Sequence, residues 1–159
     1  MPLNRSPKVY TITTALPKAR KYCAYQERSQ QEVRDKLYDL GLHKREVEQT
    51  IVILIEEGFL NEQRFAITFA GGKFRINKWG KVKIRLALKA KKISDYCIRE
   101  ALNQIPVKDY KKTLEKILQV RRSKQSKMDS AGEKYKLAQY AISRGYEPDL
   151  VWDTLKSDE

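Results

Sequence analysis

Positively charged side chains are the residues of this sequence with the clearest chemical role. Between residues 73 and 92, nine of twenty are Lys or Arg and none is acidic, and Phe74 and Trp79 lie among them. Ammonium and guanidinium groups bind phosphate oxygens, and the planar guanidinium contacts two of them at once. We therefore predict a surface that binds phosphate or acidic protein. Its candidate residues are Lys73, Arg75, Lys78, Lys81, Lys83, Arg85 and Lys89.

A second basic cluster lies at residues 121–127, where the sequence reads RRSKQSK. Its candidate residues are Arg121, Arg122 and Lys124. A segment rich in Lys, Ser and Gln contacts a nucleic-acid backbone without reading bases. A solvated charged face is an equally good interpretation of this cluster. Two roles also stay open for Trp79, stacking on a base and packing in the core, and we favour packing.

Residues for catalysis or metal binding are scarce. His43 is the single histidine, and Cys23 and Cys97 lie far apart, so the sequence lacks the ligand spacing of a zinc site. The two glycines before Lys73 lack the spacing and the preceding strand of a phosphate-binding loop. We therefore expect no catalytic residue, no metal and no cofactor, and a protein that acts by binding rather than as an enzyme.

Composition limits the class of protein. The 159 residues carry 33 Lys and Arg against 20 Asp and Glu, a formal net charge of +13, and 41% are hydrophobic, enough for a folded core. Such charge suggests nucleic acid, a protein–nucleic-acid assembly or an anionic membrane as partner. The longest strongly apolar run, 51–55, is far shorter than the roughly 20 residues of a membrane span. Without a signal-peptide pattern in residues 1–14, and with two separate cysteines, we expect a cytoplasmic protein, and we expect a monomer.

Helix start and stop signals divide the chain. Pro17 is typical of a first helical turn and predicts a helix to about residue 27. Ser29 and Glu32 have the spacing of a capping box, and Gly41 stands where a left-handed residue ends a helix. A further helix is predicted from Lys44 to residue 57.

The same pattern of apolar residues occurs three times, at shifts of 51 and then 53 residues. The equivalent positions are Val33, Ile84 and Leu137; Leu37, Leu88 and Ala141; Leu42, Ile93 and Tyr146; Val47, Ile98 and Val151; Ile51, Leu102 and Leu155. Leading helices precede them at about 17–27, 62–76 and 107–122. We predict an all-α protein, an elongated, curved array of three tandem three-helix modules at 15–60, 61–105 and 106–159, after a flexible segment at 1–14.

The segment 81–89 alternates apolar and charged residues, which by itself is typical of a half-buried strand. The repeat and the helix-forming residue types favour a helix instead. In that helix Val82 and Leu86 point outward, where the first module has Gln31 and Asp35. Two outward apolar side chains call for a partner surface.

Three blocks resemble the RecX family of recombinase regulators. RSQQEV at 28–33, with Lys36, Leu37 and Gly41, is similar to the family's RSxxELxxKLxxxG stretch. GFLNEQRFA at 58–66 is similar to its turn into a helix, and GKVKI at 80–84 is similar to its third landmark. The family's glycine before Ile93 is Lys92 here, so we expect strain or a different turn at that helix end.

The resemblance implies a protein that lies in the groove of a RecA filament on single-stranded DNA. There it modulates, and we expect inhibits, ATP hydrolysis, strand exchange and the SOS co-protease activity. Direct contact with the DNA is expected to be weak or through the filament. Two alternatives stay open: a general, sequence-independent nucleic-acid-binding helical protein without a recombinase partner, and an adaptor whose charge serves solubility.

Overall fold

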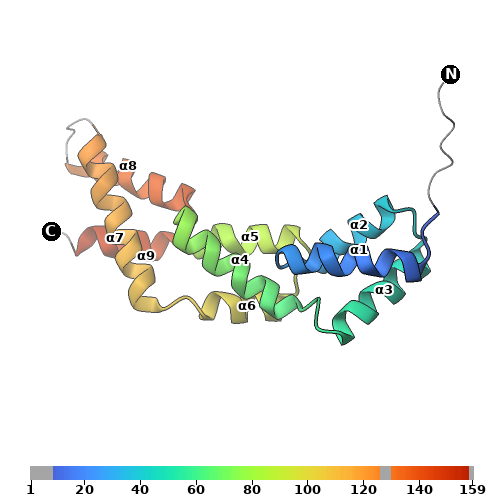
Figure 1. Ribbon diagram of the computed structural model, residues 1–159. Helices are drawn as coiled ribbons and strands as arrows, with labels where there is room; N and C mark the ends of the chain where they lie inside the picture. Colours follow the sequence, from blue (N-terminus) through green and yellow to red (C-terminus); the bar gives the residue numbers. More distant parts are fainter. Residues whose placement is uncertain (1–8, 126–129, 158–159) are drawn as a thin grey trace, which may run out of the picture. The chain divides into compact units, whose positions relative to one another are not determined.

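The computed structural model describes residues 9–125 and 130–157, and in these ranges the chain forms nine α-helices and no strand (Figure 1). The helices are α1 (Ile12–Tyr25), α2 (Gln30–Asp39), α3 (Lys44–Glu56), α4 (Glu62–Asn77), α5 (Lys81–Ala90), α6 (Asp95–Asn103), α7 (Val107–Lys124), α8 (Ser130–Ser143) and α9 (Pro148–Lys156). The all-α prediction is therefore confirmed. In the described ranges, none of the helices combines the length and the apolar composition needed to cross a bilayer.

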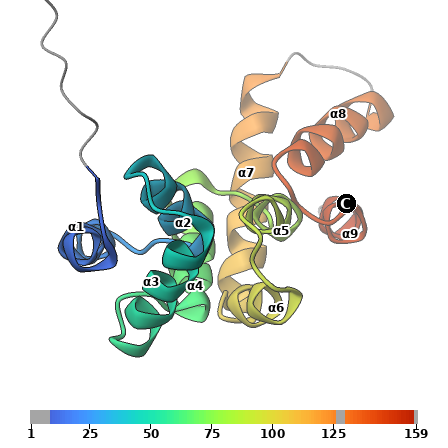
Figure 2. The same cartoon turned by 90° about the vertical axis from the view of Figure 1, so that its right-hand side faces the viewer.

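The chain divides after Phe65, inside α4, into two compact units. In the first unit α1, α2 and α3 pack on one another around a common apolar core (Figure 1). In the second unit α5 packs against α6, and α8 packs against both α7 and α9 (Figure 2). The third predicted module and all but residues 61–65 of the second thus fall within one unit.

The repeated apolar pattern marks the core. All fifteen equivalent positions of the three repeats are buried, and the most exposed of them, Ile93, shows only 7% of its surface. This agreement has a simple cause: residues three and four apart lie on one face of a helix, so each repeat buries the same stripe.

The three repeats also share one backbone turn. The second helix of each ends at a residue with positive φ: Gly41 at 92°, Lys92 at 61° and Gly145 at 101°. The next residue then donates its N–H to a carbonyl five positions back, a bond of 3.2 Å in each repeat. Lys92 therefore adopts the left-handed conformation of its glycine counterparts, which is unfavourable for a residue with a Cβ. The expectation of strain at this position is met without a change of turn.

The first helix begins earlier than predicted. Thr11 and Thr14 cap its start reciprocally, and Pro17 lies inside the helix. Residues 12–14 are therefore helical and do not belong to a flexible segment. The side chains of the threonine pair bond to the N–H groups that are free at the start of the helix, so the helix does not need proline in its first turn. Residues 1–8 of the predicted segment lie outside the described residues.

The segment 81–89 is helical, as the repeat required. Ile84 and Leu88 are completely buried, whereas Val82 is 42% and Leu86 is 64% exposed. The outward orientation predicted for these two apolar side chains is thereby confirmed.

Candidate functional site

The exposed face of α5 presents Val82 and Leu86, one turn apart, beside Arg85 and Lys89. The Lys89 Nζ atom lies 3.7 Å from Asp95 Oδ1, so one cation of the basic segment has a carboxylate partner. This exposed pair is weak. Arg85 makes no ion pair with a described residue. The face therefore combines uncovered apolar surface with an available guanidinium.

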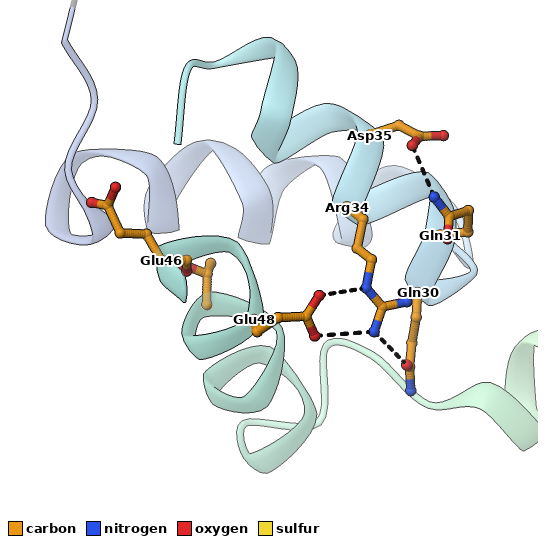
Figure 3. Close-up of polar contacts among 7 residues, drawn as sticks. Gln30, Gln31, Arg34, Asp35, Glu46 and Glu48 are labelled. Atoms are coloured by element: carbon orange, nitrogen blue, oxygen red, sulfur yellow. Dashed lines mark hydrogen bonds and ion pairs between the residues drawn. The ribbon is translucent and has the colours of Figure 1, made fainter. Parts of the chain in front are cut away.

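On the equivalent face of α2, the polar side chains bond to one another and to α3 (Figure 3). Gln31 donates a hydrogen bond of 3.0 Å to Asp35 along the helix. Arg34 donates to both carboxylate oxygens of Glu48 on α3, at 2.8 and 3.2 Å, and this contact holds the pKa of the Glu48 carboxyl below its usual value. At the position equivalent to Glu48, the second repeat has Arg99, so Arg85 has no such partner.

Other predicted basic residues are held on aromatic rings. The ammonium groups of Lys73 and Lys83 lie 4.9 and 4.6 Å from the centre of the Trp79 ring, and that of Lys81 lies 4.9 Å from Tyr110. Cations in this position are attracted to the ring face. The half-buried Trp79 is thus covered by two lysines, which supports its packing role.

Arg75 lies apart from these contacts. Its guanidinium packs on Gly71, where an added Cβ would lie only 2.7 Å from an Arg75 nitrogen. It also lines a separate small cavity with Asp109. The seven candidates of the segment 73–92 therefore do not form a single surface.

The turn between α4 and α5 is fixed against the turn between α8 and α9. Gly80 donates its N–H to the carbonyl of Arg144, and Val82 donates to that of Gly145, both at 2.9 Å. A Cβ added to Gly80 would lie 2.2 Å from the Gly145 backbone, so only glycine permits this approach. The Tyr146 hydroxyl donates to the carbonyl of Lys78 at 2.9 Å. These contacts set Lys78 beside Arg144.

Tyr110 completes this junction from α7. Its hydroxyl accepts the N–H of Lys81 at 2.9 Å and donates to Glu147. Burial raises the pKa of Tyr110 and of Tyr146 above the usual tyrosine value, so both hydroxyls stay protonated as the hydrogen bonds require. The rings of these two tyrosines lie 5.1 Å apart.

Beside the junction is a cavity of about 450 Å³ between α7, α8 and the end of α4. Six of its lining residues are basic: Lys78, Lys112, Lys116, Arg121, Lys124 and Arg144. The other lining residues are Thr113, Ile117, Val120 and Tyr140. Among the described residues around it, none is acidic.

The cavity joins the two predicted basic clusters. Lys78 comes from the first cluster, and Arg121 and Lys124 come from the second. Sequence reasoning missed Lys112 and Lys116, although the four-residue spacing between these two lysines, which places them on one face of a helix, was a usable signal.

Arg144 lines the cavity although it was not predicted, and Arg122 was predicted but does not line it. Arg144 carried no sequence signal, because its place in the cavity depends on the fold of the α8–α9 turn. Arg122 does not line the cavity and forms an ion pair of 3.3 Å with Glu133. The end of the predicted second cluster, residues 126 and 127, lies outside the described residues.

Comparison with known families identifies two of the three repeats. Residues 15–52 match the model of the first three-helix domain of RecX, and residues 61–102 match the model of its second three-helix domain. Together the two matches cover half of the chain. The chain belongs to the RecX family.

Curated RecX relatives extend this similarity beyond the two domains. The regulatory protein RecX of Clostridium acetobutylicum is 30% identical over 134 residues, which cover 81% of this chain and 61% of that protein. That of Bacillus mycoides is 25% identical over 145 residues, which cover 88% of this chain and 52% of that protein. The chain thus spans between half and two thirds of the length of these RecX relatives.

Solved RecX structures share the fold. The crystal structure of RecX from Lactobacillus salivarius superposes with a TM-score of 0.82 at 23% identity, over 92% of this chain and 95% of that one. A second RecX crystal structure gives a TM-score of 0.77 at 21% identity, over 93% and 74% of the two chains. The exposed face of α5 lies within the matched second RecX domain, whereas α7 and α8, which line the basic cavity, lie beyond both domain matches.

Proposed function

We propose that this chain regulates a RecA recombinase by binding its filament on single-stranded DNA, without catalysing a reaction itself. Membership of the RecX family supports the proposal, because the curated relatives are named regulatory proteins. The expected effect is inhibition of ATP hydrolysis, strand exchange and co-protease activity.

The observation that carries the proposal furthest is the uncovered face of α5. Val82 and Leu86 expose apolar surface between cations, and Arg85 lacks the carboxylate that its counterpart Arg34 has. Exposed apolar residues within a charged rim are typical of protein interfaces. The net charge of +13 further favours an acidic or phosphate-bearing partner.

The proposal is tested by the ATPase activity of the cognate RecA on single-stranded DNA. The chain is titrated well below one molecule per recombinase subunit, with and without excess DNA. Inhibition at such ratios that survives added DNA supports binding to the filament. Absence of inhibition, or inhibition that disappears with excess DNA, contradicts it.

A charge-reversal pair tests the α5 face in the same assay. Lys81 and Lys83 pack on aromatic rings, so the exposed Arg85 and Lys89 are the better targets. Arg85→Glu with Lys89→Glu should raise the concentration for half-inhibition by about tenfold, because like charges then meet at the interface. The matched control is Lys108→Glu with Lys111→Glu on α7, which changes the net charge equally and should leave inhibition unaltered. If the α5 variant and the α7 control had the same concentration for half-inhibition, the α5 face would not be part of the interface.

A general nucleic-acid-binding protein is the second candidate function, and the basic cavity favours it. Steep salt dependence of DNA binding, together with inhibition that excess DNA abolishes, would distinguish it from the filament regulator. For either function we propose a monomer that acts in the cytoplasm. We also propose that the second and third modules have the boundaries predicted from the sequence, 61–105 and 106–159, and that the first, predicted at 15–60, begins with α1 at Ile12.

A further inference from the structure

The basic cavity beside α7 has two chemically distinct parts. Lys112, Lys116 and Lys124 form no ion pair with a described residue, so three ammonium groups of one helix are available. Between the cations, Ile117 and Val120 supply an apolar lining beside the ring of Tyr140. Phosphates require the first part and a nucleobase requires the second.

Arg121 and Tyr140 provide a stacking surface inside this cavity. The guanidinium of Arg121 lies over the Tyr140 ring, 4.4 Å from its centre. Nucleobases stack both on aromatic rings and on guanidinium planes. The volume of about 450 Å³ is in the range of sites that enclose a small ligand, and one nucleotide is such a ligand.

The opposite wall is held rigidly. Lys78 has the left-handed conformation, with φ of 59°, and Tyr146 bonds its carbonyl. The ammonium group of Lys78 also donates to the carbonyl of Arg75 at 2.7 Å. The Arg144 guanidinium donates to the carbonyl of Asn77, which fixes it beside Lys78. This wall of the cavity is therefore held by bonds to the backbone and does not depend on flexible side chains alone.

We propose that this cavity binds single-stranded DNA, with one base against Tyr140 and Arg121 and the adjoining phosphates along α7. The cations from Lys112 to Lys124 extend over about 18 Å of the helix axis, given a rise of about 1.5 Å per residue. That spacing suits a chain of phosphodiesters better than the compact phosphates of a free nucleotide. The proposal rests on the proposed function in one respect: the strand is the one that the recombinase filament carries.

Direct binding of DNA, without any recombinase, tests this inference. The full chain is titrated into a labelled oligothymidylate on the order of 12 nucleotides long, and the affinity is measured at several salt concentrations. Lys112→Glu with Lys116→Glu should lower the affinity at least tenfold. It should also flatten the plot of log K against log salt by about 1.4, because two phosphate contacts are lost at about 0.7 each.

The matched control is again Lys108→Glu with Lys111→Glu, two exposed lysines of the same helix that do not line the cavity. This variant should bind within about twofold of the unaltered chain. An equal loss of affinity in both variants would overturn the proposal, because binding would then follow net charge alone. No loss in either variant would overturn it as well.

The position of the base is tested separately with 2-aminopurine in the oligonucleotide, whose fluorescence falls on stacking. Tyr140→Phe should keep the quenching, and Tyr140→Leu should lose it together with about tenfold in affinity. Unchanged quenching in the leucine variant would exclude the stacking site.

Competition decides between ligand classes. The competitors are a nucleoside triphosphate and a Glu-rich peptide with one aromatic residue. If either displaced the oligonucleotide at a lower concentration than thymidylate oligomers do, the cavity would be assigned to that ligand instead. Failure of this inference is distinguishable from failure of the proposed function. ATPase inhibition by the unaltered chain is measured independently, and it can persist in a chain whose cavity does not bind DNA.

Discussion

The second helix of the first repeat and the second helix of the second repeat share a fold and differ in what they expose. On α2, Gln31 and Asp35 bond to each other and Arg34 is paired with Glu48 (Figure 3). On α5, the same positions hold Val82, Leu86 and Arg85, which forms no ion pair within the described part of the chain. The buried positions of the two helices are equally apolar.

The outward positions are where function can reside in a repeat protein. The inward stripe must stay apolar in every repeat, because each three-helix unit is too small to lose any of its core. The outward positions are free of that requirement, so one repeat can satisfy its own polar groups while the next leaves a surface for a partner.

The largest expected effect comes from giving α5 the outer face of α2. Val82→Gln with Leu86→Asp copies Gln31 and Asp35 and should raise the concentration for half-inhibition of the recombinase by more than about tenfold, because buried apolar anchors dominate interfaces. Stability should change by less than about 0.5 kcal/mol, since both positions are on the surface. The measurements are ATPase titration and thermal denaturation by circular dichroism. Inhibition equal to that of the unaltered chain would show that the comparison has no functional meaning.

An intermediate effect is expected from the shared turn. Lys92→Gly should stabilise the protein by about 1 kcal/mol, because glycine adopts positive φ without the steric penalty of a Cβ. Gly41→Lys should destabilise the first repeat by a similar amount. Urea denaturation of each variant measures both changes. A less stable Lys92→Gly variant would indicate that the lysine side chain contributes more than the turn does.

The smallest effect concerns the pair that only the first repeat has. Arg34 lowers the pKa of Glu48, so the stabilisation is present above the ordinary glutamate pKa and is lost as the pH falls through the lowered value. Glu48→Gln should therefore cost less than 1 kcal/mol at pH 7, because the pair is partly exposed. Its difference from the unaltered chain should shrink in urea denaturation as the pH falls through the lowered pKa of Glu48.

Arg99→Glu is the matching change in the second repeat, where it creates the carboxylate that Arg85 lacks. It should add a similar small stabilisation at pH 7, which is lost as the pH falls and the new carboxylate is protonated. A stabilisation independent of pH would mean that the new carboxylate does not pair with Arg85.

The sequence predicted well whatever depends on local periodicity. The fifteen core positions and the helical state of 81–89 follow from residue spacing along single helices. At Lys92 the sequence left strain and a different turn open, and the structure shows the left-handed conformation. The predicted start of α1 was wrong. Pro17 is typical of a first helical turn, but the helix is capped at Thr11 by a threonine pair and Pro17 lies inside it.

The repeated inward stripe, its caps and the net charge follow from the sequence, because they depend on the types and spacing of neighbouring residues. Which cations are available to a partner depends on tertiary contacts. Contacts far apart in the sequence placed Lys81 on Tyr110, and they brought Lys78 together with Lys112 and Arg144 around one cavity. Those contacts depend on the close approach of two turns at Gly80 and on how helices of different repeats pack, and helical periodicity within one segment carries no information about either.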